Sequence, residues 1–316
     1  MPTNEAEEAA YAVAERIIAD LGKKAFYLSL RLNTAETRAL NRLPASLGRL
    51  GQLWNLLLDG TAITDDALVA LAPLGNLRTL DLTDTAITDA GLVHLASLGQ
   101  MQFLTLENTR IGDAGLVYLA SLGKMQNLDL SNTRIGDAGL AMLAPLTGLQ
   151  VLDLSGTAIT DGGLAALTPF TGLRVLFLTR TRITGAGLAA IAALGQLEFL
   201  HLGATDLTDA GLTAVAGLTG LRKLSMYETS VTEAGLAALT GKRLVSLNLS
   251  GTAIADLRPV LALDIMAEDA GRRGDGLEFS DTPACARDPK LAELAEIVDD
   301  FERTRATRDY LATLLG

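Results

Sequence analysis

Two histidines and one cysteine are the side chains of this sequence best suited to nucleophilic or acid–base chemistry. His201 and Ser225 occupy the same position in adjacent sequence repeats, and a hydroxyl beside an imidazole can act as a nucleophile–base pair. One repeat before His201, however, that position holds Phe177, so no carboxylate is placed to orient the imidazole. The sequence therefore predicts no catalytic triad, and we expect that the protein is not an enzyme.

Metal and nucleotide chemistry are also not predicted. Neither His94 nor His201 has a second His or Cys at the spacing of zinc ligands, so we expect no metal centre. Residues 185–190 read Gly-Ala-Gly-Leu-Ala-Ala and match the dinucleotide pattern GxGxxA, but they are in frame with the Asp-Ala-Gly-Leu of other repeats. A repeat helix is the preferred interpretation. No GxxxxGK[ST] segment occurs, and we predict no cofactor.

A tandem repeat positions all of these residues. The segment LRTLDLTDTAITDAGLVHLASLGQ, residues 77–100, recurs almost unchanged, and successive repeats begin 24 residues apart at 77, 101, 125 and 149. Further copies begin at 173, 197 and 221. Self-similarity at a fixed period indicates a solenoid, in which identical coils stack on one another.

Each repeat predicts a strand, a turn and a short helix. Alternation places Leu80 and Leu82 on one face of the strand. Thr88 can cap the helix, and Asp89 adds a carboxylate to its first turn. The buried face of the helix is predicted from three leucines at helical spacing: Leu92, Leu95 and Leu98. We expect Gly99 to end the helix in a left-handed conformation.

A column of threonines, one in each repeat, is predicted to be structural. A Thr hydroxyl offers one donor and two lone pairs, so inward-pointing threonines can satisfy buried backbone groups in the turns of successive coils and hold the coils in register. The column consists of Thr61, Thr85, Thr109, Thr133, Thr157, Thr181, Thr205, Thr229, Thr252 and Thr282.

The consensus LxxLxLxxTxIxDAGLxxLxxL resembles a leucine-rich repeat of the bacterial type, with Thr where many such proteins carry Asn. The resemblance covers residues 25–284. It implies an α/β solenoid: a right-handed coil with a parallel sheet on the concave side, short helices on the convex side and helical caps at both ends. Residues 1–24 are expected to form the N-terminal capping helix, and residues 285–316 the C-terminal helical cap. The concave strand face is where such proteins bind other macromolecules.

Composition narrows the choice of partner and compartment. A net charge of -11 with a pI near 4.7 opposes binding to nucleic acid or to acidic membranes and favours, if anything, a basic partner. One cysteine excludes an intramolecular disulfide, as expected for a reducing interior. The acidic N-terminal segment lacks an apolar signal core, and no apolar run reaches the length of a membrane span. We therefore expect a cytoplasmic protein, with a monomer favoured.

Two short motifs are better explained without function. Cys285 and Asp288 are similar to the Cys-x-Asp of bacterial ubiquitin ligases that carry leucine-rich repeats, but their spacing differs by one residue, and a loop cysteine is the preferred interpretation. The tripeptide at residues 273–275, Arg-Gly-Asp, matches an adhesion motif, and a cytoplasmic location would make that match accidental.

The outward strand positions hold the candidate binding residues. Aromatic side chains flanked by cations are typical of interface hot spots, whereas scattered apolar surface residues alone would need no explanation. The candidate partner-binding residues on the concave face are Phe103, Phe177, Arg180, Phe199, His201, Lys223, Tyr227 and Glu228.

The resulting functional prediction is a non-catalytic scaffold that binds a protein or peptide on its concave face. The alternative is a bacterial effector or substrate-recognition subunit that recruits a ubiquitin-ligase-type or signalling partner. Neither end of the sequence carries a recognisable ligase segment to support the alternative.

Overall fold

The structure is a computed structural model that describes residues 4–22, 29–265 and 276–315. The Arg-Gly-Asp tripeptide at 273–275 lies outside the described residues. Internal packing divides the chain into two compact units, Met1–Ala158 and Ile159–Gly316, called the first and the second unit below. This division differs from the predicted one at residues 24 and 284, which remains a prediction.

In the first unit, strands alternate with short helices that are partly α and partly 3-10 (labelled η). Its elements are α1 (Asn4–Leu21), β1 (Ser29–Arg31), η1 (Ala45–Arg49), β2 (Asn55–Leu57), η2 (Asp65–Leu71), β3 (Thr79–Asp81), α2 (Asp89–Leu92), η3 (Val93–Leu95), β4 (Phe103–Thr105), η4 (Asp113–Ser121), β5 (Asn127–Asp129), α3 (Asp137–Met142) and β6 (Val151–Asp153).

The second unit continues the same alternation and ends in three α-helices. Its elements are η5 (Asp161–Leu167), β7 (Val175–Phe177), η6 (Leu188–Ile191), β8 (Phe199–His201), α4 (Asp209–Ala216), β9 (Lys223–Ser225), α5 (Glu233–Ala237), β10 (Arg243–Leu244), β11 (Ser246–Asn248), η7 (Arg258–Ala262), β12 (Asp264–Ile265), β13 (Gly276–Glu278), α6 (Pro283–Arg287), α7 (Pro289–Ala295) and α8 (Asp300–Thr313).

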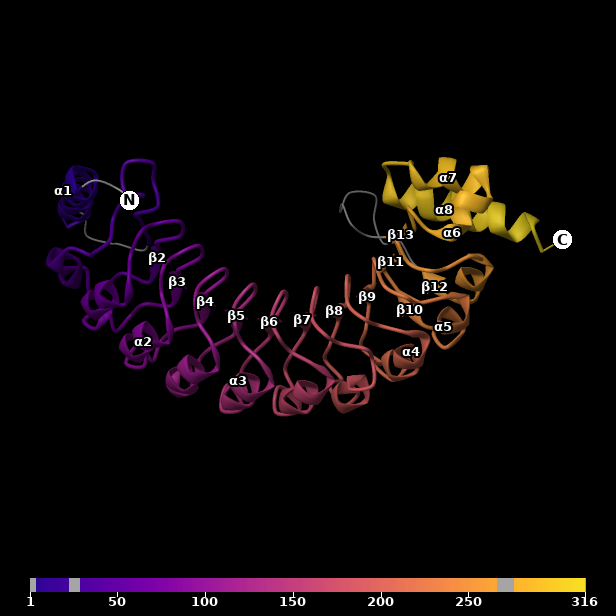
Figure 1. Cartoon of the computed structure of the whole chain (residues 1–316), viewed down its shortest axis with the longest axis horizontal. Coiled ribbons are helices and arrows are strands. Elements are labelled where there is room, and N and C mark those ends of the chain that lie inside the picture. The colour runs from indigo at the N-terminus through magenta and orange to yellow at the C-terminus, as the bar shows by residue number, and fades with distance from the viewer. Residues whose placement is uncertain (1–3, 23–28, 266–275, 316) are drawn as a thin grey trace. The chain divides into compact units, whose positions relative to one another are not determined.

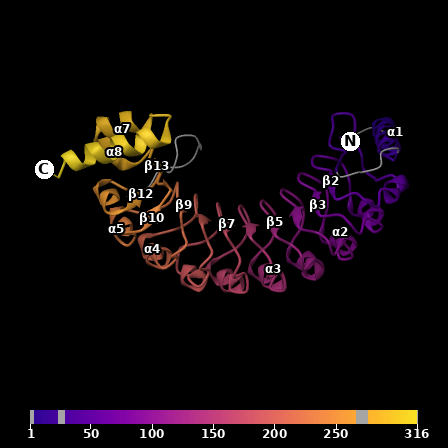
Figure 2. The ribbon, with the colours of Figure 1, turned by 180° about the vertical axis from the view of Figure 1, so that it is seen from behind.

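Within each unit the strands are parallel and pair in chain order. In the first unit β1 to β6 form consecutive pairs. In the second unit the order is β7, β8, β9, β11, β13, and β10 pairs separately with β12. The strands lie on one side of each unit and the short helices on the other (Figure 1), and the view from behind shows the same separation (Figure 2). This confirms the predicted solenoid of strands and outer helices.

Leucine side chains fill the space between strands and helices. The central residue of each three-residue strand is a buried leucine, such as Leu80 or Leu200, and Leu92, Leu95 and Leu98 are fully buried as predicted. Each buried leucine or isoleucine stabilises the fold by about 1.5–3 kcal/mol relative to exposure, so coil stacking is the main stabilising force.

The left-handed conformation predicted at Gly99 is wrong. The helix instead ends in tight i→i+3 hydrogen bonds: the Leu98 N–H donates to the Leu95 carbonyl at 2.9 Å, and Met101 donates to Leu98 at 2.9 Å. These bonds satisfy the last carbonyls without a left-handed residue. Positive φ occurs on the other side of the coil, after the strand, as at Asp84 (φ 57°).

Helices flank the strands at both ends of the described chain. The predicted N-terminal helix is present as α1, and its Glu15 accepts a hydrogen bond from Ser46 at 3.0 Å. At the other end α8 covers β13: Thr304 Oγ1 accepts from the Leu277 N–H at 2.8 Å, and Arg303 Nε donates to the Leu277 carbonyl at 2.8 Å. Edge-strand groups that would otherwise be open to another chain are thereby paired.

Cys285 does not lie in a loop, as predicted, but in helix α6. The hydroxyl of Thr282 caps this helix by accepting from the Cys285 N–H at 3.4 Å, and Pro283 provides the first helical residue. Among the described residues, no helix combines the length and the apolar character that crossing a bilayer requires.

Candidate functional site

The ten threonines of the predicted column are all buried. Each hydroxyl donates to the carbonyl oxygen three residues earlier in its own coil, at 2.5–2.7 Å from Thr61 to Thr252 and at 3.1 Å for Thr282. The bond therefore closes the turn within one coil. The sequence interpretation had assumed that it joins successive coils, which it does not. Other groups must hold the coils in register.

A column of carboxylates, which the sequence interpretation assigned only to the helix ends, joins the coils. Asp89 Oδ1 accepts from the Gly112 N–H at 2.7 Å, and Asp113 Oδ1 accepts from Gly136 at 2.7 Å, in both cases from the next coil. Asp65, Asp209 and Glu233 make the same type of contact. The signal in the sequence was the glycine that stands two residues after most of these carboxylates: a Cβ at Gly115 would lie 2.6 Å from Asp89 Oδ1 of the preceding coil.

The candidate binding residues lie on the face of each sheet turned away from the helices, called the open strand face. Each coil contributes four residues to this face. They are the first and third residues of the strand, and the two residues that come after the next buried position of the chain. Phe103 belongs to the first unit, where its register neighbours are Thr79 and Asn127, so no aromatic ring adjoins it. The other seven candidates lie in the second unit on β7, β8, β9 and the turns that follow them.

Four rings gather on the open strand face of β7–β9 and form what we call the ring cluster: Phe177, Phe199, His201 and Tyr227. Phe177 and His201 are register neighbours and stack with ring centroids 4.5 Å apart and planes at 26°. Lys223 Nζ lies 4.9 Å from the centre of the Phe199 ring. The Tyr227 ring lies across Gly203, where a Cβ would overlap it. Phe177, Phe199 and Tyr227 are half-buried, which leaves part of each ring accessible.

The surroundings of His201 favour its neutral form. Burial beside Phe177, and then the positive charge of Lys223, lower the pKa of His201. Its register neighbours are Phe177 and Ser225, so no carboxylate orients the imidazole from either adjacent strand.

The same three coils carry unusual backbone conformations. After each strand one residue adopts positive φ, directly before the buried threonine; we call these positions the left-handed row. In the first unit the row is occupied by residues that tolerate this conformation: Gly60, Asp84, Asn108, Asn132 and Gly156. In the second unit it continues with Arg180 (φ 56°), Ala204 (φ 52°) and Glu228 (φ 52°), and only then returns to Gly251 and Asp281.

A left-handed conformation costs roughly 1–2 kcal/mol for a residue with a Cβ and no compensating side-chain hydrogen bond. The backbone holds these residues in place, because the N–H of Arg180 donates to Gly203 at 3.0 Å and that of Ala204 to Tyr227 at 2.7 Å. Strain of this type is commonly retained at functional sites. The sequence interpretation selected Arg180 and Glu228 for their charge but did not detect the strain.

The open strand face of the first unit is acidic and differs in character from the ring cluster. Burial, and then the charges of Asp129 and Asp84, raise the pKa of Glu107. Burial also raises the pKa of Asp153. Among the described residues, no three His, Cys, Asp or Glu side chains are grouped so that they could hold a metal ion.

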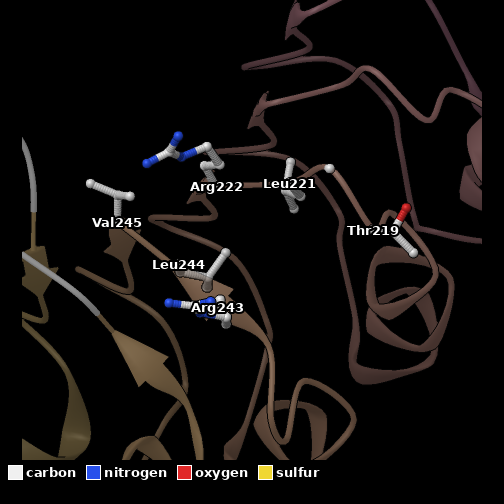
Figure 3. A pocket seen from close by; sticks show the side chains of 7 residues that line it. Thr219, Leu221, Arg222, Arg243, Leu244 and Val245 are labelled. Carbon is white, nitrogen blue, oxygen red and sulfur yellow. The ribbon is translucent and has the colours of Figure 1, made fainter. Parts of the chain in front are cut away.

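A hollow of about 320 Å³ lies where β10 and the neighbouring strands begin (Figure 3). Its charged lining consists of Arg222 and Arg243, and Arg243 forms an ion pair with Asp264 at 3.0 Å. Both arginines take part in other interactions of the fold. The hollow is therefore not the candidate site, which remains the ring cluster and the left-handed row beside it.

Comparison with known proteins identifies the repeat. A family model described as "Leucine Rich repeat" matches residues 76–96, 124–144 and 147–167. No curated protein matches the sequence.

Solved structures show the same architecture. The chain is similar to an internalin (InlF) of Listeria monocytogenes, with 25% identity, a TM-score of 0.64 and coverage of 84% of this chain and 74% of that one. A leucine-rich-repeat protein of Leptospira interrogans matches at 18% identity, TM-score 0.60, over 81% and 72%. The ectodomain of the Arabidopsis thaliana receptor kinase GASSHO1/SCHENGEN3, solved in complex with CASPARIAN STRIP INTEGRITY FACTOR 2, matches at 19% identity, TM-score 0.56, over 83% of this chain and 31% of that one.

Proposed function

Because this chain is a leucine-rich-repeat protein by its repeats and its fold, we propose that it binds a protein or peptide through the ring cluster, without catalysing a reaction. The leucine-rich-repeat fold is a scaffold for protein–protein interaction, as in the plant receptor ectodomain solved with its factor. The finer proposal assigns the contact to the open strand face of β7–β9. A cytoplasmic, monomeric protein is proposed with it, since a single cysteine fits a reducing compartment.

One observation carries the proposal: the ring cluster and the strained part of the left-handed row occupy the same three coils. Either feature alone has a structural explanation. Exposed rings occur singly on many surfaces, and a left-handed alanine can be an accident of sequence. Their coincidence favours selection for the side chains presented there, because glycine, which this chain uses at Gly60, Gly156 and Gly251, would relieve the strain.

The ring cluster has the properties of an interface hot spot. Aromatic side chains bury a large apolar area at low entropy cost, and rings that pack against one another before binding are already ordered. Phe177 stacks on His201, and the Tyr227 ring packs on the surface of Gly203. Little rearrangement is therefore needed on binding. The alternative role, an effector or recognition subunit for a ubiquitin-ligase-type or signalling partner, would use the same site and differ in the partner recruited.

Photo-crosslinking tests the proposal. A photoreactive phenylalanine derivative is placed at Phe199 in one variant and at Phe103 in another. These positions are matched, because each is the first residue of its strand and lies on the open strand face. A protein that crosslinks to the variant with the derivative at position 199, but not to the variant with it at position 103, is identified and purified. Its affinity for the parent protein is then measured by calorimetric titration.

The affinity of that protein for the variant Phe177→Ala/Phe199→Ala/Tyr227→Ala is expected to fall at least 30-fold, since the loss of one hot-spot residue costs about 2 kcal/mol or more. Phe103→Ala should leave it within twofold of the parent. Circular dichroism establishes that the triple variant is folded. Equal affinity of the parent and the folded triple variant would contradict the proposed site.

A further inference from the structure

Resting on the proposed function, we propose that the partner of the ring cluster is a peptide segment in which an acidic side chain, Asp or Glu, lies beside an apolar one. The carboxylate binds the guanidinium of Arg180, and the apolar side chain packs against the accessible rings of Phe177, Phe199 and Tyr227.

Arg180 is positioned to receive such a carboxylate. It is exposed, and it lies in the same coil as Phe177, three residues after the end of β7. Its backbone is fixed, because its N–H donates to the Gly203 carbonyl at 3.0 Å in the next coil. The residues beside it in that coil, Gly203 and Ala204, are small, and the Tyr227 ring of the following coil lies across Gly203, so the ring surface and the guanidinium belong to neighbouring positions.

No carboxylate among the described residues forms an ion pair with Arg180, whereas Arg174 near this face is already paired. Arg174, which precedes β7, binds Glu198 through Nε at 3.0 Å and through Nη2 at 2.7 Å. Glu228 lies two coils from Arg180 in the left-handed row, with Ala204 between them. A planar guanidinium recognises a carboxylate through two parallel hydrogen bonds, so Arg180 is suited to an acidic side chain from outside the chain.

The charge around the ring cluster also favours an anion, in contrast to the net charge of the whole protein. Lys223 lies over the Phe199 ring, on the same face as Arg180. The acidic groups that dominate the net charge of -11 include those on the open strand face of the first unit, where burial and then neighbouring carboxylates raise the pKa of Glu107. A basic peptide would be attracted to that face. An acidic one is repelled there and attracted to Arg180 and Lys223.

The strain at Arg180 gives a clean variant for the test. Arg180→Gly removes the guanidinium and replaces a strained residue by the one that fits positive φ, so the variant is expected to fold at least as well as the parent. Arg134→Ala is the matched control: it removes one exposed arginine and the same unit of charge from the first unit.

The experiment selects binders from a random 12-residue peptide library displayed on phage, using purified full-length protein. Parallel selections use the folded triple variant Phe177→Ala/Phe199→Ala/Tyr227→Ala and the variant Arg180→Gly. The expected result is enrichment of Asp or Glu next to an aromatic or branched apolar residue. A selected peptide should bind Arg180→Gly about tenfold or more weakly than the parent, as the loss of a charge-assisted hydrogen bond predicts. The affinity of the peptide for Arg134→Ala should equal its affinity for the parent. Replacing the Asp or Glu of the peptide by Asn or Gln should weaken binding only when Arg180 is present.

The remaining outcomes separate the two proposals. Peptides that depend on the ring cluster but show no acidic preference, or bind Arg180→Gly as well as the parent, would overturn the acidic-segment inference and leave the binding site in place. Enrichment of basic peptides would overturn it in favour of the acidic face of the first unit. Recovery of the same peptides on the triple variant, or of no peptide on the parent, would overturn both.

Discussion

Substituting glycine into the strained part of the left-handed row should stabilise this protein and weaken its binding. At Arg180, Ala204 and Glu228, φ lies between 52° and 56°, where a Cβ is unfavourable. Relief of that conformation stabilises the folded state by roughly 1–2 kcal/mol. The greater freedom of glycine in the unfolded chain offsets about 0.4–1 kcal/mol of this gain. The net gain is therefore about 0.5–1 kcal/mol at each position, or on the order of 2 kcal/mol for the triple glycine variant if the three positions act independently.

Thermal and urea unfolding measure this gain. A domain of this size shifts its melting temperature by about 2 °C for each kcal/mol, so the triple glycine variant should melt about 4 °C higher than the parent. Arg182→Gly is the control, because Arg182 is chemically identical to Arg180 and two residues away but does not have positive φ. That change should lower stability, since it adds freedom to the unfolded chain and relieves no strain.

Two results would refute the reasoning. If Arg180→Gly and Arg182→Gly both lower the melting temperature by the same amount, the left-handed row stores no strain and its coincidence with the ring cluster has no meaning. If Arg180→Gly stabilises the fold and binding is also unchanged, the strain is real but is not retained for the contact with a partner.

Three further predictions follow from the columns that build the coils and from the half-buried His201. Thr157→Val should lower the free energy of unfolding by about 1–3 kcal/mol, because a buried carbonyl loses its hydroxyl donor, whereas Thr157→Ser should retain most of it in urea titrations. Gly115→Ala should cost about 1–3 kcal/mol, because the new methyl would lie 2.6 Å from a carboxylate oxygen of the preceding coil, while Gly123→Ala, which meets nothing within 4 Å, should be neutral in the same assay. Burial and Lys223 lower the folded-state pKa of His201, so the unfolded chain binds the proton first, and the stability contributed by the neutral ring is complete above about pH 6.5 and decreases as the pH falls below it. His201→Gln should remove that part of the pH dependence between pH 7.5 and 5, as measured by urea unfolding across the range.

The regular part of the fold could be predicted from the sequence because one period is imposed on every coil. Alternation at Leu80 and Leu82 and helical spacing from Leu92 onward assign each side chain to the interior, and the structure buries them all. A single coil would have been ambiguous. Repetition at 24 residues removes the ambiguity, because only one assignment of strand and helix fits every copy.

The contacts between coils were harder to predict, because a sequence pattern describes one coil at a time. Asp89 satisfies the rule for a helix first turn, and that explanation concealed its bond to Gly112 in the next coil. The Cβ space at Gly115 depends on the same neighbour. Pairs of this type become visible only when each residue is compared with the one about 23 to 26 positions away.

The candidate site was predicted as a set of outward positions but not as an arrangement. Register placed Phe177 beside His201, and the structure adds that the two rings stack. The path of the Tyr227 ring across Gly203 depends on a rotamer and on the missing Cβ of its neighbour. The conformation of Arg180 could have been inferred from Gly60 and Gly156, which hold the same place in other coils.

The carboxylate column bears on how this array can be lengthened or shortened. Most coils present an Asp on one side and a glycine on the other, so they are interchangeable, and duplication or deletion of a whole coil would leave every junction satisfied. The repeat that begins at Leu173 is the exception, because Gly185 stands where the other regular repeats carry Asp or Glu. A Cβ at Gly185 would lie 2.5 Å from the Gly211 Cα, and Asp161 of the preceding coil binds the Thr184, Gly185 and Gly187 N–H groups at 2.9–3.2 Å. This repeat has no carboxylate to offer the next one, so the segment that carries β7 and Phe177 is the part of the array that gene duplication cannot freely shuffle.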